Sequence, residues 1–539
     1  MKTTSSSQRP SVYLRFFVII VLVLGIFFRF NNLDQKNFWL DEVINSFYSS
    51  GYTKVEFIQQ VQAWDGQQIS FEDLHKYQSP NSDKSAIDVI KALASEEPQN
   101  PPVYYLLSRW WMQLFGASVI VRKSLSVLIS LLAFPLMYWL ALELFKSPVS
   151  AWIAMELLAI SPLHLIYAQE VRHYVAWTVI ILLSSSVLLW AIRLNKKLPW
   201  VIYASTLTLG LYTFPFSVLI ALGHGIYVSI NEQFRRTKIM IAYSVATITS
   251  MLAFSPWLLA IMLNSQKMGK WRKLSIPFPR YLNGLITNTS RVFLDLTPEN
   301  ILKVNLSELP LILSLARIVI VILIIYAVYF ICRHTDQRIW LFLVTLIGVT
   351  TLTLMLPDLI FGGIRGLMMR YLIPCYLGIE LAVAYLLTTK ITSQEANIWQ
   401  QKLWQIAMVT LIVSGVISSG IISQSQSWWH QFRNYNNPQI AKIINQSQSP
   451  IVGSDLGSLE GLVGLNVGHI VSLSYLLKPQ VKYQFFLDAN LNTMTDDTRK
   501  IFLLNPSDKL QQSIEKEDDL NIERVFQGIF SLMEVRKDR

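Results

Sequence analysis

Long apolar runs set the first constraint on what this chain can fold into. Eleven runs, most of them near the roughly 20 residues that cross a ~30 Å hydrocarbon layer, lie in the first 425 positions. They cover 12–30, 119–145, 148–168, 172–193, 198–213, 214–231, 238–263, 309–332, 338–358, 368–389 and 403–425. The composition agrees, since 52% of the residues are hydrophobic and only 15% are charged. We therefore predict an α-helical polytopic membrane protein with about 11 transmembrane helices.

Basic residues between these runs predict the orientation of the chain. If residue 1 is cytoplasmic, every expected inner connection carries Lys or Arg, as the positive-inside rule requires. These residues are Lys146, Arg193, Lys196, Lys197, Arg235, Arg236, Lys238, Arg333, Arg338, Lys390 and Lys402. The same parity places four segments outside: 31–118, 169–171, 264–308 and the tail after 425. The outer stretch "QKMGKWRKLSIPFPR" is also basic and breaks the rule.

The number of spans has one open point. The runs at 198–213 and 214–231 are short enough to form one helix, which would change the parity.

The charge and the cysteines argue against two other classes of function. The net charge of +11 is explained by basic cytoplasmic loops, so no nucleic-acid partner is expected. Cys332 and Cys375 lack the spacing of a zinc site or a disulfide framework, so redox chemistry is not expected.

The first outer segment, 31–118, is too long for a simple hairpin connection. It contains amphipathic pieces such as "SAIDVIKALASEE" and the apolar stretch "NPPVYYLLSRWWMQLFG". The second stretch is short and contains Arg109, so we predict an interfacial helix that begins at Pro101 and Pro102. If it crossed the membrane, every later loop would change sides.

The chain changes character after residue 425. "SPIVGSDLGSLEGLVGLNVGHIVSLSYLL" has a β-branched run, a Gly/Asp turn, a helical stretch and another β run, and "GIFSLMEVRK" is typical of a strand. The glycine spacing does not fit a nucleotide-binding fingerprint. We therefore predict a transmembrane domain over 1–425, which includes the first extracytoplasmic loop at 31–118, and a small soluble extracytoplasmic α/β domain over 426–539. The second domain is expected to be a structural or acceptor-docking cap.

Charged residues gather at the predicted outer surface. Asp41 and Glu42 follow the first run in "NFWLDEVINS", Glu170 and Arg172 lie between two runs in "SPLHLIYAQEVRHYVAW", and Arg370 begins a later run in "MMRYLIPCY". Each has a plain alternative explanation: a solvated loop start, a local ion pair, or an arginine that snorkels to lipid phosphate. Together they predict one acidic and basic cluster at the edge of the bilayer.

Four stretches in order resemble a known family. "FWLDEV", "NPPVYYLLSRWWMQLFG", "YAQEVRHY" and "RYLIP" are similar to motifs of the membrane glycosyltransferases of family 39 type, which have the C-type glycosyltransferase fold. That superfamily includes protein O-mannosyltransferases and lipid A aminoarabinose transferases. Each motif is weak alone, whereas four in order over about residues 12–390 are fairly specific. The likeness in layout extends to the C-terminus.

The resemblance implies an enzyme of the cell membrane, either a bacterial inner membrane or a plasma membrane. It would transfer a sugar from a polyprenyl-phosphate donor to a lipid, glycan or protein acceptor on the extracytoplasmic side. The aspartate of the first loop, Asp41, would be the catalytic carboxylate. The sequence departs from the family at Asn100, where many members have His or Lys before the proline pair. A donor-phosphate contact at Asn100 would therefore be weaker or be made elsewhere.

The chemistry of this transfer assigns roles to the clustered residues. An acceptor hydroxyl or amine needs a base, for which Asp41 is the first choice, and Glu42 either shares that role or orients a backbone or basic group. The leaving phosphate needs fixed cations, and the two-pronged guanidinium groups of Arg172 and Arg370 suit it. The expected substrate-binding residues are Asn100, Tyr167, Glu170, Tyr174 and Tyr371.

Few oxygen ligands are present, so we predict a reaction without a metal or other cofactor. Two other classes of protein remain as alternatives, a transporter and a non-catalytic assembly protein of the cell envelope. A transporter favours ionisable groups near mid-membrane and two related halves, whereas here the charges gather at one surface and no internal repeat is seen. The donor sugar and the acceptor are left open.

Overall fold

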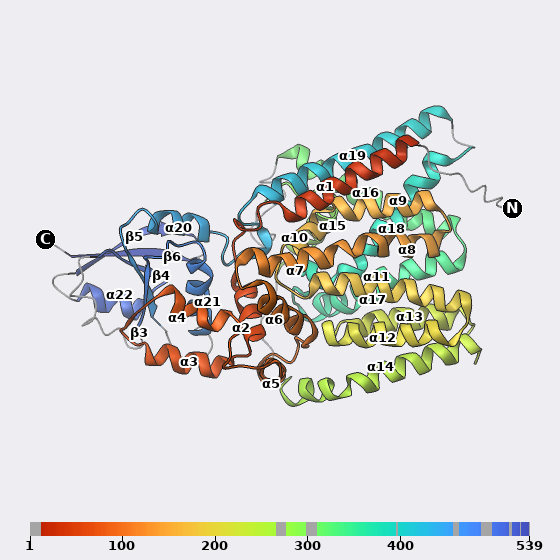
Figure 1. Ribbon diagram of the computed structural model, residues 1–539. Helices are drawn as coiled ribbons and strands as arrows, with labels where there is room; N and C mark the ends of the chain where they lie inside the picture. Colours follow the sequence, from red (N-terminus) through yellow and green to blue (C-terminus); the bar gives the residue numbers. More distant parts are fainter. Residues whose placement is uncertain are drawn as a thin grey trace.

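Membrane-type helices form one end of the molecule and a mixed sheet forms the other (Figure 1). The computed structural model describes residues 12–265, 276–297, 310–394, 397–455, 463–486, 499–516, 520–528 and 530–537. The N-terminal end of α1 lies at the end of the helix bundle farthest from the sheet, and helices of the first loop lie between bundle and sheet (Figure 1). The predicted fold class, a helical membrane protein with a small α/β module near the C-terminus, is confirmed.

The helix bundle accounts for most of the chain. Its helices are α1 (Val12–Phe30), α7 (Val119–Leu131), α8 (Ala133–Phe145), α9 (Pro148–Ile160), α10 (Pro162–Ala168), α11 (Tyr174–Leu194), α12 (Lys197–Thr213), α13 (Ser217–Asn231), α14 (Lys238–Leu263), α16 (Leu311–His334), α17 (Gln337–Phe361), α18 (Ile373–Thr392) and α19 (Ile398–Gln424). Shorter elements at its outer end are α15 (Phe278–Ser290), η5 (Arg365–Leu367) and η6 (Met369–Tyr371).

A helix lies in each of the eleven predicted runs. Among the described residues, seven helices are long and apolar enough to cross a membrane when α7 and α8 are counted as one continuous helix over 119–145, or eight if α9 and α10 form one bent span. α1 and α13 are apolar but shorter, so the number of crossings stays a prediction. α12 and α13 are separate helices with a turn at 214–216 between them, which rules out a single helix over 198–231.

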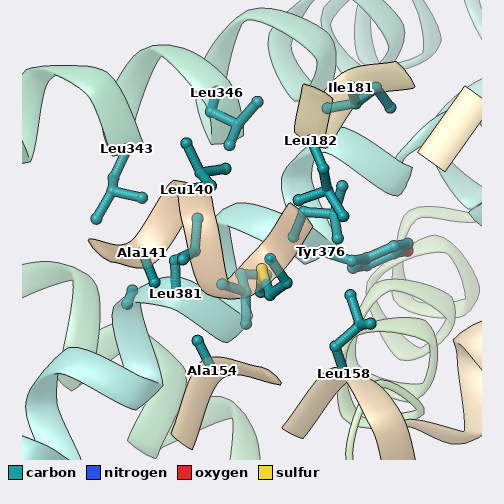
Figure 2. Close-up of a cluster of buried hydrophobic side chains, with 14 of the residues drawn as sticks. Leu140, Ala141, Ala154, Leu158, Ile181, Leu182, Leu343, Leu346, Tyr376 and Leu381 are labelled. Carbon is teal, nitrogen blue, oxygen red and sulfur yellow. The ribbon is translucent and has the colours of Figure 1, made fainter. Parts of the chain in front are cut away.

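The core of the bundle lies between α8, α9, α11, α17 and α18. Side chains from these helices meet in one cluster, each at most 5% exposed (Figure 2). The labelled members are Leu140, Ala141, Ala154, Leu158, Ile181, Leu182, Leu343, Leu346, Tyr376 and Leu381. By contrast, α14 and α16 expose rows of Leu and Ile, as helices that face lipid do.

A break between α9 and α10 changes the direction of the chain before the turn at 169–173. Pro162 begins α10, and the two helices meet at an angle of 58°. The break frees carbonyl groups, and Arg29 of α1 donates to Ala159 O at 2.6 Å. A Cβ at Gly25 would lie 2.6 Å from the same oxygen, so glycine allows α1 to approach this closely. The turn at 169–173 is therefore placed at the outer end of the bundle.

The segment 31–118 folds into short elements that pack against the bundle on one side and the sheet and its helices on the other. They are α2 (Leu40–Ser50), α3 (Lys54–Ala63), β1 (Gln68–Ile69), α4 (Phe71–His75), η1 (Lys76–Gln78), α5 (Ala86–Glu96) and α6 (Val103–Phe115). The helix predicted in 85–97 is confirmed as α5, and its N-cap Ser85 accepts from Asp88 N in a capping box. α6 has 13 residues, about 20 Å at 1.5 Å per residue, which is too short to cross a bilayer.

The C-terminal part forms a mixed six-stranded sheet of order β1-β3-β2-β4-β6-β5. Its elements are η7 (Trp429–Gln431), α20 (Asn437–Ile444), β2 (Ile451–Asp455), α21 (Val463–Ser474), β3 (Lys482–Phe486), β4 (Ile501–Leu504), α22 (Asp508–Glu515), β5 (Leu520–Gln527) and β6 (Ser531–Lys537). β2 is parallel to β3 and β4, whereas the other pairs are antiparallel. β1 comes from the first loop, and Ile69 pairs with Tyr483. The first loop and the C-terminal part therefore share one sheet.

One local prediction in this part is wrong. The β run expected near the end of 449–477 is helical, because it belongs to α21, and the next strand is β3 at Lys482–Phe486. The buried residues Val467, Ile470, Val471 and Ser474 follow a helical spacing of three and four. Their β-branched character was therefore a weaker signal than their periodicity.

Candidate functional site

The start of α2 is fixed by the segment that follows α19. Leu40 N donates to Asn434 Oδ1 at 3.0 Å, and Trp39 N donates to Glu42 Oε2 at 3.2 Å. These contacts satisfy N–H groups that the first turn of a helix leaves free. Asp41 therefore projects from a first turn that the side chains of Glu42 and Asn434 fix in place.

Asp41 lines a cavity of about 310 Å³ at the end of the bundle where the first loop packs. The wall is built from the first loop, the α10–α11 turn, the α12–α13 turn, α14, α17 and the segment of η5 and η6. The lining residues are Asp41, Ile44, Glu97, Gln99, Asn100, Arg172, Tyr174, Phe214, Pro215, Phe216, Ile261, Leu354, Arg365, Arg370 and Tyr371. Five predicted site residues besides Asp41 are among them: Asn100, Arg172, Tyr174, Arg370 and Tyr371.

Two arginines hold the Asp41 carboxylate in this cavity. Arg370 Nη1 donates to Asp41 Oδ2 at 3.0 Å, and Arg172 Nη2 lies 3.9 Å from the same oxygen. Arg172 Nη1 also donates to the backbone oxygen of Asp41 at 3.3 Å. The Nε atoms of both arginines are buried and have no hydrogen-bond partner. The site therefore keeps unused donors on both guanidinium groups.

Both arginines lie against the same aromatic ring. The guanidinium carbons of Arg172 and Arg370 lie 5.6 and 5.7 Å from the Tyr174 ring centre. Arg370 also lies 5.4 Å from the ring of Tyr371, and cation–π contact at these distances orients both guanidinium groups. Tyr167 is not in the cavity wall, and its ring packs behind Tyr174 with centres 5.7 Å apart.

Glu42 points away from the cavity into a buried ion pair. Its Oε1 accepts from Lys123 Nζ at 2.5 Å and from Val171 N at 2.9 Å, and Lys123 Nζ also donates to Gln169 O at 3.1 Å. Burial raises the pKa of Glu42, and the Lys123 ammonium and the backbone N–H groups oppose that rise. This geometry favours the orienting role for Glu42, because it joins α2 to α7 and to the turn that carries Arg172.

Glu170 lies behind the cavity wall and is 3% exposed. Its Oε2 has no hydrogen-bond partner. Burial, followed by the nearby carboxylates of Glu42 and Asp41, raises the pKa of Glu170 to about 8, although Arg172 and Arg370 oppose the rise. Glu170 is therefore largely protonated at neutral pH and does not neutralise the arginines.

Sequence reasoning missed three polar residues of the wall, Glu97, Gln99 and Arg365. Glu97 and Gln99 directly precede the "NPPVYY" motif, so their place beside Asn100 could have drawn attention to them. Arg365 begins η5, shortly after Gly362 and Gly363, and resembles an ordinary boundary arginine. Its Nη1 lies 3.2 Å from Asp358 Oδ1, so its charge is already paired.

The comparisons with known proteins find likeness only at the level of structure. No protein-family model matches the chain, and no curated protein matches it either. ArnT from Cupriavidus metallidurans bound to undecaprenyl phosphate is 11% identical, with a TM-score of 0.51 over 97% of this chain and 98% of that chain. The same ArnT in the apo state gives a TM-score of 0.50, with 97% of each chain covered. The chain has the C-type glycosyltransferase fold.

A third solved structure is the oligosaccharyltransferase AglB from Archaeoglobus fulgidus in complex with an inhibitory peptide and a dolichol-phosphate. It is 12% identical, with a TM-score of 0.48 over 87% of this chain and 65% of that chain.

In this C-type glycosyltransferase fold, the cavity forms where the first outer loop meets the α10–α11 turn and η6. Among the described residues, no three His, Cys, Asp or Glu side chains gather in a way that could hold a metal ion. The basic stretch Lys267–Lys273, the part of "QKMGKWRKLSIPFPR" that breaks the positive-inside rule, lies outside the described residues.

Proposed function

We propose that the protein is a membrane glycosyltransferase that transfers a sugar from a polyprenyl-phosphate donor to a lipid, glycan or protein acceptor on the extracytoplasmic side. The observation that carries the proposal is the Asp41 carboxylate held between Arg172 and Arg370 in the wall of one cavity. A general base and a pair of guanidinium groups are the two components that such a transfer requires. ArnT, which shares the fold, was solved with undecaprenyl phosphate bound.

The balance of charge around the cavity favours an anionic donor with one negative charge. Asp41 compensates one of the two arginines that it contacts, and Glu170 is largely uncharged because its pKa is raised to about 8. Arg365 is paired with Asp358. One positive charge remains, which matches the single charge of a phosphodiester that links a sugar to a polyprenyl chain.

The reaction then assigns one step to each group. The acceptor oxygen or nitrogen attacks the anomeric carbon and loses its proton to the Asp41 carboxylate. The bond between the anomeric carbon and the phosphate oxygen breaks, and its electron pair leaves with polyprenyl phosphate. That product carries one more negative charge than the donor phosphodiester, so Arg172 and Arg370 stabilise it more strongly than they stabilise the donor.

A lipid substrate also fits the apolar part of the lining. Ile261 and Leu354 extend the wall onto α14 and α17. The outer faces of these helices expose Leu258, Leu259 and Leu356, among others. The helices that carry the apolar part of the cavity wall therefore also expose apolar side chains, as the binding of a polyprenyl chain requires.

The extracytoplasmic orientation rests on the positive-inside rule. Arg193 and Glu143 form an ion pair of 2.6 Å near the C-terminal ends of α11 and α8, with Lys196 and Lys197 close by in sequence. The cavity lies at the opposite end of α11, where Tyr174 begins the helix. The basic end is expected to face the cytoplasm, so the cavity is expected to face outward.

Mass spectrometry of cell-envelope glycans, lipids and proteins tests this proposal. Cells without the gene should lose a glycosylated species that the wild-type gene restores. Asp41→Asn should not restore it, because removal of a general base lowers the rate by about 10²–10⁴-fold while the side-chain volume hardly changes. The purified variant should still bind undecaprenyl phosphate. Full restoration by Asp41→Asn would rule out Asp41 as the base.

A further inference from the structure

One wall of the cavity has a different chemical character from the arginine side. The segment between α5 and α6 contributes Glu97, Gln99 and Asn100 to the lining. These side chains offer both hydrogen-bond donors and acceptors, as sugar hydroxyl groups require. Phe214 and Phe216 of the α12–α13 turn add aromatic rings to the same cavity. A polar wall together with aromatic rings is suited to a carbohydrate.

The polar wall carries no uncompensated charge. Glu97 Oε1 accepts from Lys54 Nζ at 2.5 Å, and Glu97 Oε2 accepts from Gln99 Nε2. Asn100 Nδ2 lies 3.5 Å from the same Oε2. The lysine balances the carboxylate, and the other two side chains are neutral amides. A ligand group with a full charge of either sign would therefore lack a matching partner here.

One atom of the Gln99 amide has no hydrogen-bond partner. Its Oε1 is buried and has no partner in the protein. A buried acceptor without a donor is unfavourable, and rotation of the Gln99 amide towards the cavity would let a ligand hydroxyl donate to it. Gln99 is therefore the side chain of this wall that gains most from a ligand.

The backbone of this wall is held rigidly. Asn100 N donates to Glu97 O at 2.8 Å and closes a turn. Trp257 of α14 donates from Nε1 to Pro98 O at 2.9 Å. Prolines at 98, 101 and 102 restrict the chain further. The wall is therefore organised before a ligand arrives, which lowers the entropic cost of binding.

We propose that Glu97, Gln99 and Asn100 recognise the hydroxyl groups of the transferred sugar, and that this sugar is a single uncharged monosaccharide. The inference rests on the proposed function, since it places the donor phosphate at Arg172 and Arg370. The cavity volume of about 310 Å³ lies at the small end of the range for ligand pockets, which suits one sugar residue better than a long oligosaccharide. A uronic acid would bring its carboxylate towards Glu97, and an amino sugar would compete with Lys54.

Binding of defined lipid phosphates to the full-length protein in nanodiscs tests the inference. The probes are undecaprenyl phosphate without a sugar and its mannosyl, glucosyl, arabinosyl, glucuronosyl and aminoarabinosyl derivatives. At least one uncharged sugar lipid should bind more tightly than both charged ones. Tightest binding by either charged sugar lipid would overturn the inference. So would equal binding of all five sugar lipids.

Two variants locate the contact on the polar wall. Gln99→Leu should weaken binding of the preferred sugar lipid by about 3- to 10-fold, because one hydrogen bond to the sugar is lost. It should leave the affinity for sugar-free undecaprenyl phosphate unchanged. Glu97→Gln leaves Lys54 unpaired, so it should shift the preference towards the glucuronosyl lipid. If neither variant changes the ratio of sugar-bearing to sugar-free binding, the wall does not recognise the sugar.

The two proposals fail in different ways. Sugar-free undecaprenyl phosphate contacts only the arginine side, so failure of every lipid phosphate to bind would overturn the proposed function, and this inference with it. Normal binding of the sugar-free lipid with no response to the wall variants would overturn the inference alone. Unchanged thermal unfolding midpoints of both variants, measured without lipid, separate loss of recognition from loss of folding.

Discussion

Arg370 Nη1 donates to Asp41 Oδ2 at 3.0 Å across 329 positions of sequence. The pair joins the first turn of α2 to η6, which directly precedes α18. Arg172, from a third part of the chain, approaches the same oxygen at 3.9 Å. The carboxylate and both cations are therefore positioned by the packing of the bundle and not by any one segment.

Arg172→Lys and Arg370→Lys should each slow sugar transfer by about 10- to 100-fold, because lysine keeps the charge but loses the two-pronged contact with phosphate. Single-turnover assays with saturating lipid donor measure the chemical step. Arg365→Lys is the matched control, since Arg365 lines the same cavity but is paired with Asp358. It should have a smaller effect. Wild-type rates in both Arg172 and Arg370 variants would mean that these arginines only anchor helices.

Glu42 and Lys123 should be strongly coupled in stability. Lys123→Met leaves a buried carboxylate without its partner and should destabilise the protein by about 3–5 kcal/mol. The double variant Glu42→Gln, Lys123→Met removes both charges and should recover much of that loss. Unfolding midpoints of the two single variants and the double variant give the coupling energy. Additive losses would contradict the buried ion pair seen at 2.5 Å.

The Glu42 variant also separates two roles for this carboxylate. If Glu42 only orients α2 and the 169–172 turn, transfer by Glu42→Gln should follow the amount of folded protein. Loss of transfer as complete as that of Asp41→Asn, in a variant with a wild-type unfolding midpoint, would instead make Glu42 part of the chemistry.

Glu170 should make the folded protein less stable as pH rises from about 5 to 8. Its pKa is raised to about 8 in the fold, above an ordinary value of 4.5, so over this interval the folded state binds more protons than the unfolded state. Stability therefore falls with rising pH, and Glu170→Gln should flatten that fall. Thermal unfolding of both proteins at pH 5, 7 and 9 checks the sign. A steeper fall in the variant would contradict the raised pKa.

Residues 31–118 and 426–539 should lie on the same, extracytoplasmic side, because β1 and β3 belong to one sheet. Cysteines placed at the exposed residues Ser82 and Gln512 should react with a membrane-impermeant maleimide in intact cells. Lys196→Cys, at the other end of the bundle, should not react. The background variant needs Cys332→Ser, since that native cysteine is exposed. Labelling of Ser82→Cys and Gln512→Cys on opposite sides would contradict the shared sheet.

Local sequence patterns were enough to predict the class of fold and several candidate residues of the site. Apolar runs predicted the helices because a span must satisfy its own backbone groups, and this leaves a strong local pattern. Asp41, Arg172 and Arg370 could be singled out because they lie at the ends of different apolar runs that the predicted parity places on the same side of the membrane. Amphipathic spacing likewise predicted α5.

The way in which these residues meet could be seen only in the folded chain. Nothing local indicates that Glu42 points to Lys123 while its neighbour Asp41 points into the cavity. The two-residue strand β1 has no periodicity to detect, and it forms because β3 offers an edge. The polar wall of Glu97 and Gln99 became visible only once α14 and the α12–α13 turn enclosed it. These features depend on contacts between distant segments, which a local pattern does not encode.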